Sequence, residues 1–230
     1  MEKYLRDLYL GFMKQTLTGQ VYPESSMSMV GIENMNNIKV LSEIIINENI
    51  PGDFVETGIW RGGSCIFMAA ILKAYQVTDR NIWGFDSFEG LPKPNAEKYP
   101  QDANDPHWKR DELAISYEEV KNNFDKCQLL SDQIKLVKGF FSDTLPKNEI
   151  DKIALLRLDG DMYESTIVAL ENLFPKVVVG GYIIVDDFYL PNCRQAIHDY
   201  MRSTGITGFM VPINEGRPLA GSSVYWKKLP

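Results

Sequence analysis

Several features that mark specialised proteins are absent from this sequence. The longest apolar runs, such as Ile44–Ile46 and Tyr182–Val185, fall far short of the roughly 20 residues that a membrane-spanning helix needs. Cysteine is scarce, and its three copies (Cys65, Cys127 and Cys193) are an odd number without Cys-x-x-Cys spacing. These counts exclude a disulfide framework and a cysteine zinc site, and they are typical of reduced thiols in the cytoplasm.

An excess of basic residues is also missing. The chain has 24 Lys and Arg against 31 Asp and Glu, a formal net charge of -7 at pH 7. Binding to a phosphate backbone needs clustered basic side chains, so this balance argues against a nucleic-acid partner. The first residues, Met1 to Tyr4, do not open the charged and then apolar pattern of a signal peptide. We therefore expect a soluble, cytoplasmic protein with no membrane partner.

The chain has the length of one ordinary domain with a substantial core. Its 230 residues are 44% hydrophobic and 24% charged, which is typical of a globular protein. From Asp53 onward, short apolar strands alternate with glycine-rich turns and helices. This alternation predicts a doubly wound α/β fold with a mostly parallel sheet, in a single domain over residues 1–230. The expected strands are 53–57, 81–86, 133–139, 153–158, 181–185 and 222–226, and the expected helices are 5–17, 38–49, 64–74, 165–173 and 193–203.

Two segments stand outside this alternation. Residues 1–35 contain the first expected helix and are expected to form an N-terminal cap. Residues 89–119 carry many charged side chains and several prolines, Pro92 and Pro100 among them. Because long irregular segments of compact domains are often functional, we interpret 89–119 as an insertion that forms a lid over the site. A disordered surface loop is the alternative.

Glycines follow the first strand of the alternation. The strand ends in the segment Glu56–Ser64, where Gly58, Gly62 and Gly63 allow the backbone to turn tightly and approach a ligand. The spacing matches neither the dinucleotide fingerprint nor the phosphate-binding loop. A cationic sulfonium ligand, unlike pyrophosphate, would favour the nearby carboxylate of Glu56. A purely structural turn is the alternative.

The second strand ends in an acidic residue. Asp86 stands at the strand tip after the glycine turn, where the acid of a nucleotide-binding unit accepts the ribose hydroxyls. After the third strand, Phe140 and Phe141 offer rings that could flank an adenine. A helix cap for Asp86 and ordinary core packing for the phenylalanines are the alternatives.

Four carboxylates follow the next two strands and give the strongest signal in the chain. Asp159 and Asp161 come after the fourth expected strand, and Asp186 and Asp187 come after the fifth. Neighbouring parallel strands would bring these side chains to one edge of the sheet, where their repulsion is costly unless a cation or protons compensate. Oxygen ligands alone select a hard ion, Mg²⁺ or Ca²⁺, over zinc. Helix caps and solvated turns are the alternative.

These motifs belong to longer segments with a specific pattern. The segments are Glu56–Gly58 with Arg61–Ser64, Gly84–Pro92, Gly139–Pro146, Leu156–Thr166, Gly180–Phe188, Cys193–Ala196 and Val224–Trp226. Together they closely resemble the macrocin O-methyltransferase (TylF/MycF) family, from about Met29 to the C-terminus. The resemblance implies a class I, Rossmann-like S-adenosylmethionine methyltransferase. It also implies Mg²⁺-dependent methylation of a hydroxyl group on a natural product, either a deoxysugar or a phenolic ring.

The resemblance further implies roles for individual residues. Asp159, Asp186 and Asp187 would hold Mg²⁺. Related catechol-type enzymes have a lysine shortly after the first metal-binding aspartate, and this chain has none there, so Asp159 itself or Asp161 would accept the proton. A metal in this place would bind the acceptor oxygen and lower its pKa. The partner is then a small-molecule hydroxyl acceptor, and a homodimer is expected. The S-adenosylmethionine pocket would include Met29, Val30, Glu56, Thr57, Gly58, Ser64, Asp86, Ser87, Phe141 and Ser142.

Two histidines and two other functions are weaker candidates. His107 lies in the lid, where a surface position is expected, and His198 is interpreted as a structural residue of a helix.

One alternative function is another Mg²⁺-dependent α/β enzyme, such as a phosphotransferase or a hydrolase, which tight binding of S-adenosylhomocysteine would exclude. The other is a non-catalytic binding module, which the intact acidic cluster argues against.

Overall fold

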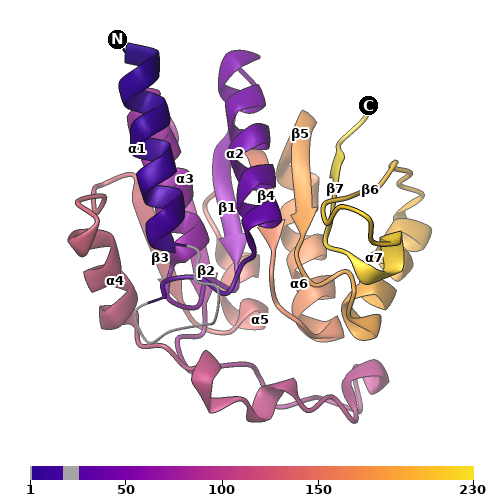
Figure 1. Cartoon of the computed structure of the whole chain (residues 1–230). Coiled ribbons are helices and arrows are strands. Elements are labelled where there is room, and N and C mark those ends of the chain that lie inside the picture. Colours follow the sequence, from indigo (N-terminus) through magenta and orange to yellow (C-terminus); the bar gives the residue numbers. More distant parts are fainter. Residues whose placement is uncertain (1, 18–25) are drawn as a thin grey trace.

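Seven strands form one sheet at the centre of the computed structural model, which describes residues 2–17 and 26–230 (Figure 1). The strands are β1 (Asp53–Thr57), β2 (Ile82–Asp86), β3 (Ile134–Lys138), β4 (Ile153–Leu158), β5 (Val177–Val185), β6 (Val211–Pro212) and β7 (Val224–Lys227). Their order in the sheet is β3-β2-β1-β4-β5-β7-β6. Strands β1 to β5 are parallel, and β7 runs antiparallel to both β5 and β6.

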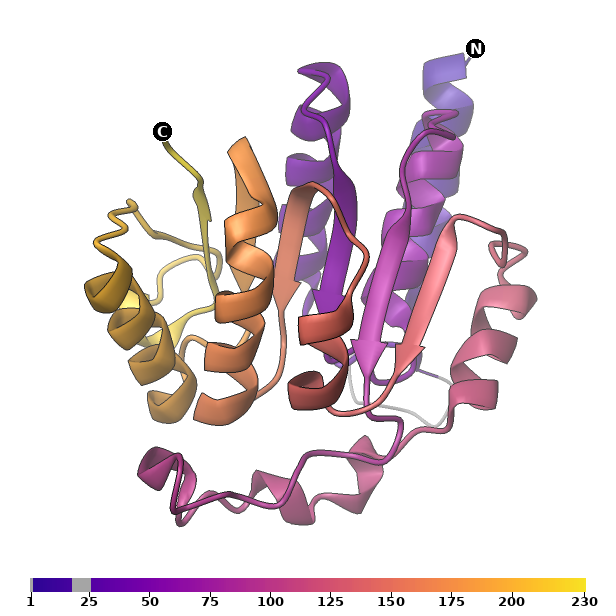
Figure 2. The ribbon, with the colours of Figure 1, turned by 180° about the vertical axis from the view of Figure 1, so that it is seen from behind.

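Helices cover both faces of this sheet (Figures 1 and 2). They are α1 (Glu2–Leu17), α2 (Ile32–Asn47), α3 (Gly63–Ala74), α4 (Tyr117–Lys126), α5 (Phe141–Thr144), α6 (Tyr163–Leu173) and α7 (Pro191–Thr204). Helices α1 to α4 contribute to one hydrophobic cluster, and α5 to α7 pack around a second one. The predicted doubly wound α/β fold is therefore confirmed.

The central strands are buried on both faces, which explains their nearly continuous apolar sequences. In β4, Leu155 belongs to the cluster under α1 to α4, and its neighbour Leu156 belongs to the cluster under α6 and α7. In β1, Phe54 and Val55 divide between the two clusters in the same way. Successive side chains of a strand point to opposite faces, so a strand covered on both sides has no polar face.

The strand order indicates which end of the sheet can bind a ligand. The chain leaves β1 toward β2 and β3 on one side and returns to β4 and β5 on the other, so the winding reverses between β1 and β4. Ligands of open α/β sheets bind at the carboxyl ends of the strands beside such a reversal. An irregular segment between β2 and α4 crosses this end of the sheet below the arrowheads in Figures 1 and 2.

Two helices, α4 and the four-residue α5, are missing from the expected elements. Helix α4 begins at Tyr117, inside the segment 89–119 that was interpreted as lid, so the irregular part ends at Ser116. The Ser116 hydroxyl accepts a hydrogen bond from the Glu119 backbone N–H at 3.2 Å, which caps the helix. Only one face of α4 is buried, through Val120, Asn123 and Phe124.

Other differences concern the ends of elements. Helix α2 starts at Ile32 and not at residue 38, and β5 starts at Val177 and not at residue 181. Strand β5 continues through Gly180, whose φ of +90° accompanies a shift of register against β4. The short β6 was not expected. Part of the expected N-terminal cap, including residues 18–25, lies outside the described residues.

Two expectations from composition can be compared with the described residues. Among these residues, no helix is long and apolar enough to cross a membrane. The thiols of Cys65, Cys127 and Cys193 are free.

Candidate active site

A cavity of about 320 Å³ opens at the carboxyl ends of the strands, beside the reversal between β1 and β4. Residues at the carboxyl ends of all five parallel strands reach it: Gly58 after β1, Asp86 at the end of β2, Phe141 after β3, Asp159 after β4 and Asp187 after β5. The lid contributes further lining residues, such as Leu113. The strand ends therefore meet around one cavity.

Gly58 lies where the backbone after β1 passes close to the backbone after β4. Its φ is +81°, and a Cβ atom built on it would lie 1.6 Å from the carbonyl oxygen of Asp159. The two segments are tied together because the Asp159 N–H donates to the carbonyl of Thr57 at 2.9 Å. Only glycine fits this conformation and this contact, so Gly58 is needed for the position of Asp159.

Asp86 organises the turn that follows β1. Its Oδ2 accepts hydrogen bonds from the backbone N–H groups of Ile59 and Trp60 at 2.9 and 3.2 Å, and its Oδ1 accepts one from Phe88 at 2.7 Å. Burial raises the pKa of this carboxyl, and the three N–H donors act in the opposite direction. A carboxylate has about four lone-pair positions, so Asp86 can still accept a hydrogen bond from a ligand in the cavity.

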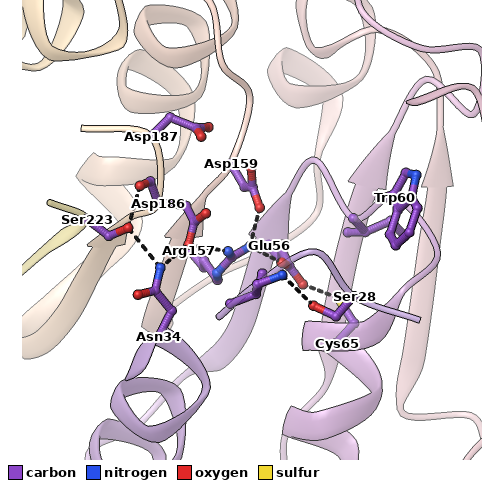
Figure 3. A network of polar contacts seen from close by, with 12 residues as sticks. Ser28, Asn34, Glu56, Trp60, Cys65, Arg157, Asp159, Asp186, Asp187 and Ser223 are labelled. Carbon is purple, nitrogen blue, oxygen red and sulfur yellow. Dashed lines mark hydrogen bonds and ion pairs between the residues drawn. The ribbon is translucent and has the colours of Figure 1, made fainter. Parts of the chain in front are cut away.

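Three aspartates converge on the other side of the cavity (Figure 3). One carboxylate oxygen from each of Asp159, Asp186 and Asp187 lies within 4.8 Å of the other two. The register Leu158↔Val185 between β4 and β5 places their following residues side by side. Burial raises the pKa of Asp159 to about 8, against the effect of the adjacent Arg157, and it raises the pKa of Asp187 well above its ordinary range.

Each of these aspartates has one oxygen engaged by the protein. Asp159 Oδ2 pairs with Arg157 at 2.7 Å, and Asp187 Oδ2 accepts the Asp161 N–H at 3.0 Å. Asp186 Oδ1 pairs with Arg157 at 2.6 Å and accepts a hydrogen bond from Asn34 at 2.8 Å. The second oxygen of each carboxylate accepts no hydrogen bond from the described residues. Three clustered carboxylates that each keep one oxygen without a donor, in a set with excess negative charge, fit a hard divalent cation.

Asp161 lies next to this cluster in a conformation that is uncommon for a side chain other than glycine. Its φ is +57°, and its carboxylate borders the cavity without accepting a hydrogen bond from the described residues. Burial raises the pKa of Asp161, and His107 and Arg110 of the lid oppose that shift. Strained residues of this kind are often found at functional sites, because the surrounding structure must hold them in place.

The lid is fixed to the body of the protein by a buried carboxylate. Asp102 accepts hydrogen bonds from the backbone N–H groups of Tyr163 and Glu164, at 2.9 and 2.8 Å, which start α6. Asn192 of α7 donates to Asp105 at 2.9 Å, and the Trp60 indole donates to the Glu112 carbonyl at 2.8 Å. The lid is therefore attached on both sides of the cavity that it covers.

Comparison with known proteins assigns the chain to a family. A sequence profile of the family described as Macrocin-O-methyltransferase (TylF) matches residues 7–228. The chain belongs to the macrocin O-methyltransferase family. Its relatives are named O-methyltransferases, and it is an O-methyltransferase of the same class.

Two relatives and one solved structure illustrate how far the similarity extends. The chain is 39% identical over 253 residues to the 8-demethyl-8-(2,3-dimethoxy-alpha-L-rhamnosyl)-tetracenomycin-C 4'-O-methyltransferase of Streptomyces olivaceus, covering 99% of this chain and 95% of the relative. It is 43% identical over 212 residues to the demethyldecarbamoylnovobiocin O-methyltransferase of Streptomyces niveus, covering 91% and 79%. The structure of the O-methyltransferase NovP superposes with a TM-score of 0.91 at 39% identity, covering 98% of this chain and 100% of that one.

The cavity of this O-methyltransferase collects most of the residues that the sequence suggested. The acidic residues Asp159, Asp161, Asp186 and Asp187 all line it. Seven of the expected cofactor contacts line it as well: Met29, Val30, Gly58, Asp86, Ser87, Phe141 and Ser142.

Three expected cofactor contacts lie elsewhere. Glu56, Thr57 and Ser64 are buried and are not among the residues that line the cavity. The Glu56 carboxylate pairs with Arg157 and accepts a hydrogen bond from the Cys65 thiol at 2.9 Å. Glu56 is buried because its side chain leaves β1 toward α3, whereas Gly58 lies beyond the end of the strand.

The two histidines differ in their surroundings. His107, for which a surface position was expected, is partly exposed: 25% of its side chain is accessible, and its Nδ1 lies 2.7 Å from the buried Asp105 carboxylate. His198 is on α7, where its ring packs edge-on against Phe188. Neither histidine lines the cavity.

Arg157 is the main residue that the sequence analysis missed. It is wholly buried and pairs with Glu56, Asp159 and Asp186. A signal was available, because Arg157 interrupts the apolar sequence Ile153–Leu158, and a charged residue in a buried strand must be paired. Trp60, Glu164 and Tyr189 also line the cavity without having been expected.

Proposed function

We propose that this enzyme transfers the methyl group of S-adenosylmethionine to a hydroxyl group of a natural-product sugar or phenol, and that a divalent cation assists. The observation that carries the proposal is one cavity with a nucleoside-type end at Gly58 and Asp86 and an acidic end at Asp159, Asp186 and Asp187. The acceptor class is supported by the relatives, which are named for methylation of tetracenomycin, novobiocin and mycinamicin compounds.

The acidic end suits Mg²⁺ as the cation. Asp159, Asp186 and Asp187 would hold it through the oxygens that accept no hydrogen bond from the described residues. A bound Mg²⁺ would supply Lewis acidity and a fixed position for the acceptor hydroxyl. These three carboxylates are offered by a rigid sheet edge, so little rearrangement is needed to bind an ion.

Methyl transfer itself requires few groups. The acceptor oxygen forms a bond to the methyl carbon as the carbon–sulfur bond breaks, which leaves S-adenosylhomocysteine and releases one proton. We infer that Asp161 accepts that proton, which is supported by its position in the cavity lining and by a carboxylate that accepts no hydrogen bond from the described residues. The lid over the cavity would exclude water and hold the two substrates in line.

Two variants test the acidic end and the nucleoside end of the cavity separately. Asp187→Asn is expected to abolish methyl transfer to a panel of deoxysugar and phenol acceptors, with the affinity for S-adenosylhomocysteine nearly unchanged. Asp86→Ala is expected to weaken that affinity by roughly 1–3 kcal/mol, because ligand hydroxyls lose their acceptor. Methyl transfer is measured with labelled S-adenosylmethionine, and the affinity for S-adenosylhomocysteine is measured by isothermal titration calorimetry.

Two results would contradict the proposal. Full turnover of Asp187→Asn would exclude the cation site. A wild-type protein that binds S-adenosylhomocysteine but methylates no hydroxyl acceptor would be the non-catalytic binding module instead.

We also infer that the enzyme works in the cytoplasm as a homodimer, with α1 in the contact. Tyr4 and Leu8 are one helical turn apart on α1 and are 69% and 58% exposed. Apolar side chains in such a row are often covered by a partner. The double variant Tyr4→Glu, Leu8→Glu is expected to halve the mass in light scattering; a monomeric wild type would contradict the inference.

A further inference from the structure

Arg157 is a charged side chain in the interior of the protein. It lies near the end of β4, directly beside Glu56 of β1 in the register of the sheet, and no part of it is exposed. Removing a guanidinium from water is costly, and the cost is offset only by close pairing with anions. The partners of Arg157 should therefore explain why a charge is placed there.

Three carboxylates from three adjacent strands meet at this guanidinium (Figure 3). Nη1 pairs with Glu56 and lies 2.7 Å from Asp159 Oδ2, and Nη2 lies 2.6 Å from Asp186 Oδ1. Arg157 thus holds one oxygen of each of two residues of the acidic cluster. Glu56 does not line the cavity and anchors the guanidinium on the side of β1.

The contacts divide the oxygens of Asp159 and Asp186 in the same way. The oxygens of Asp159 and Asp186 that Arg157 does not hold are the ones without a donor among the described residues. Asn34 of α2 reinforces the pattern, because its amide donates to the same Oδ1 of Asp186 at 2.8 Å and also to the Ser223 hydroxyl at 2.8 Å. Contacts with protein groups therefore orient both carboxylates.

We propose that Arg157 is a positioning residue of the cation site, a role that rests on the proposed function. By binding Asp159 Oδ2 and Asp186 Oδ1, it directs the opposite oxygens of these carboxylates to the place of the ion. Glu56 pairs with the same Nη1 as Asp159 and holds the guanidinium from the side of β1. Groups that orient metal ligands typically change metal affinity by roughly 10- to 100-fold when they are replaced.

A different role for Arg157 makes the opposite prediction. If the guanidinium served only to reduce repulsion among the carboxylates, its removal would leave more negative charge around the ion. Coulomb attraction would then tighten cation binding. Loss of positioning, in contrast, would weaken it, so the sign of the change separates the two roles.

The test is the affinity of the full-length protein for Mn²⁺, measured by isothermal titration calorimetry. Arg157→Lys retains the positive charge but cannot reach both aspartates with a planar fork. We expect Arg157→Lys and Arg157→Met to weaken Mn²⁺ binding by roughly 10- to 100-fold, with the affinity for S-adenosylhomocysteine retained. Arg80→Met is the control, because Arg80 is a partly buried arginine that lies before β2, at the opposite end of the sheet.

The outcomes distinguish failure of the cation site from failure of the role of Arg157. If wild-type protein binds no Mn²⁺, the cation site of the proposed function fails and the role of Arg157 fails with it. If wild type binds Mn²⁺ and Arg157→Lys binds it equally well or more tightly, only the role of Arg157 is overturned.

A neutral variant covers the case in which the Arg157 variants do not fold. Asn34→Leu removes a donor to Asp186 Oδ1 without changing any charge, and it is expected to weaken Mn²⁺ binding. Unchanged Mn²⁺ affinity in this variant would overturn the idea that the engaged oxygens orient the cluster.

Discussion

At the scale of single residues, the site depends on backbone conformations that most side chains do not adopt. Gly58 has a φ of +81°, and Trp60, Phe88 and Asp161 have positive φ values although they carry side chains. All four residues lie at the ends of β1, β2 or β4, where the chain turns sharply around the cavity. Such turns are stable only when surrounding contacts hold them, as Asp86 does for Trp60 and Phe88.

Gly58 offers a direct test of this view. Gly58→Ala is expected to lower the free energy of unfolding by about 3 kcal/mol or more, because the new Cβ combines a left-handed conformation with a collision against Asp159. Gly205→Ala is the matched control, with a φ of +70° and nothing within 4 Å, and should cost about 1 kcal/mol. Urea unfolding measures both; equal costs would show that the contact with Asp159 does not matter.

The acidic residues of the site could be predicted from the sequence, but their partners could not. Asp159, Asp186 and Asp187 follow apolar runs, and parallel strands bring their carboxyl ends to one edge, so their meeting follows from topology. The pairing of Arg157 with Glu56 depends on the register between β1 and β4, which no local pattern fixes. For the same reason the burial of Glu56 away from the cavity was not foreseen.

At the scale of elements, the lid is an integral part of the fold. Asp102 fills the position of a helix cap, since it accepts the first free N–H groups of α6 from a distant segment of the chain. The carboxylate is wholly buried, and Asn192 of α7 also donates to it, at 3.3 Å. The lid should therefore contribute to stability as well as cover the site.

This anchor predicts a dependence of stability on pH. Burial raises the pKa of Asp102, with the N–H donors of Glu164 and Tyr163 opposing it, so the folded protein binds a proton there more readily than the unfolded chain. Its contribution to stability is then greatest at low pH and is lost as the pH rises through the folded pKa. Relative to Asp102→Asn, which does not titrate, wild type should gain stability between pH 7 and pH 4.

Unfolding in urea at several pH values measures this difference. If wild type instead lost stability relative to Asp102→Asn as the pH falls, the expected direction would be contradicted. That result would mean that the folded state lowers the pKa of Asp102.

Helix α4 shows what a local pattern can and cannot reveal. The sequence Ser116-Tyr117-Glu118-Glu119 is a capping motif before a helix, and it could have placed the N-terminus of α4. The many charged residues of α4 concealed its buried face, which consists of only a few side chains. In contrast, nothing local distinguishes the two-residue β6, which exists only because it pairs with β7.

At the scale of the whole molecule, strand order joins the two ends of the active site. The alternation of strands and helices predicted the fold class, and the reversal between β1 and β4 places Gly58 against Asp159. The order of the strands follows from long-range packing, so the sequence could suggest the edge of the sheet but not the contacts within it. The cavity that combines the nucleoside end with the acidic end is a property of the complete sheet.

The central claim is that Asp159, Asp186 and Asp187 hold a divalent cation beside the methyl donor. Crystals grown with S-adenosylhomocysteine and saturating Mn²⁺ test it most directly, through an anomalous difference map. We expect one strong peak per chain, in contact with one oxygen from each of the three aspartates and on the side away from Arg157. A map without a peak between these carboxylates, or with its only peak elsewhere in the molecule, would contradict the account.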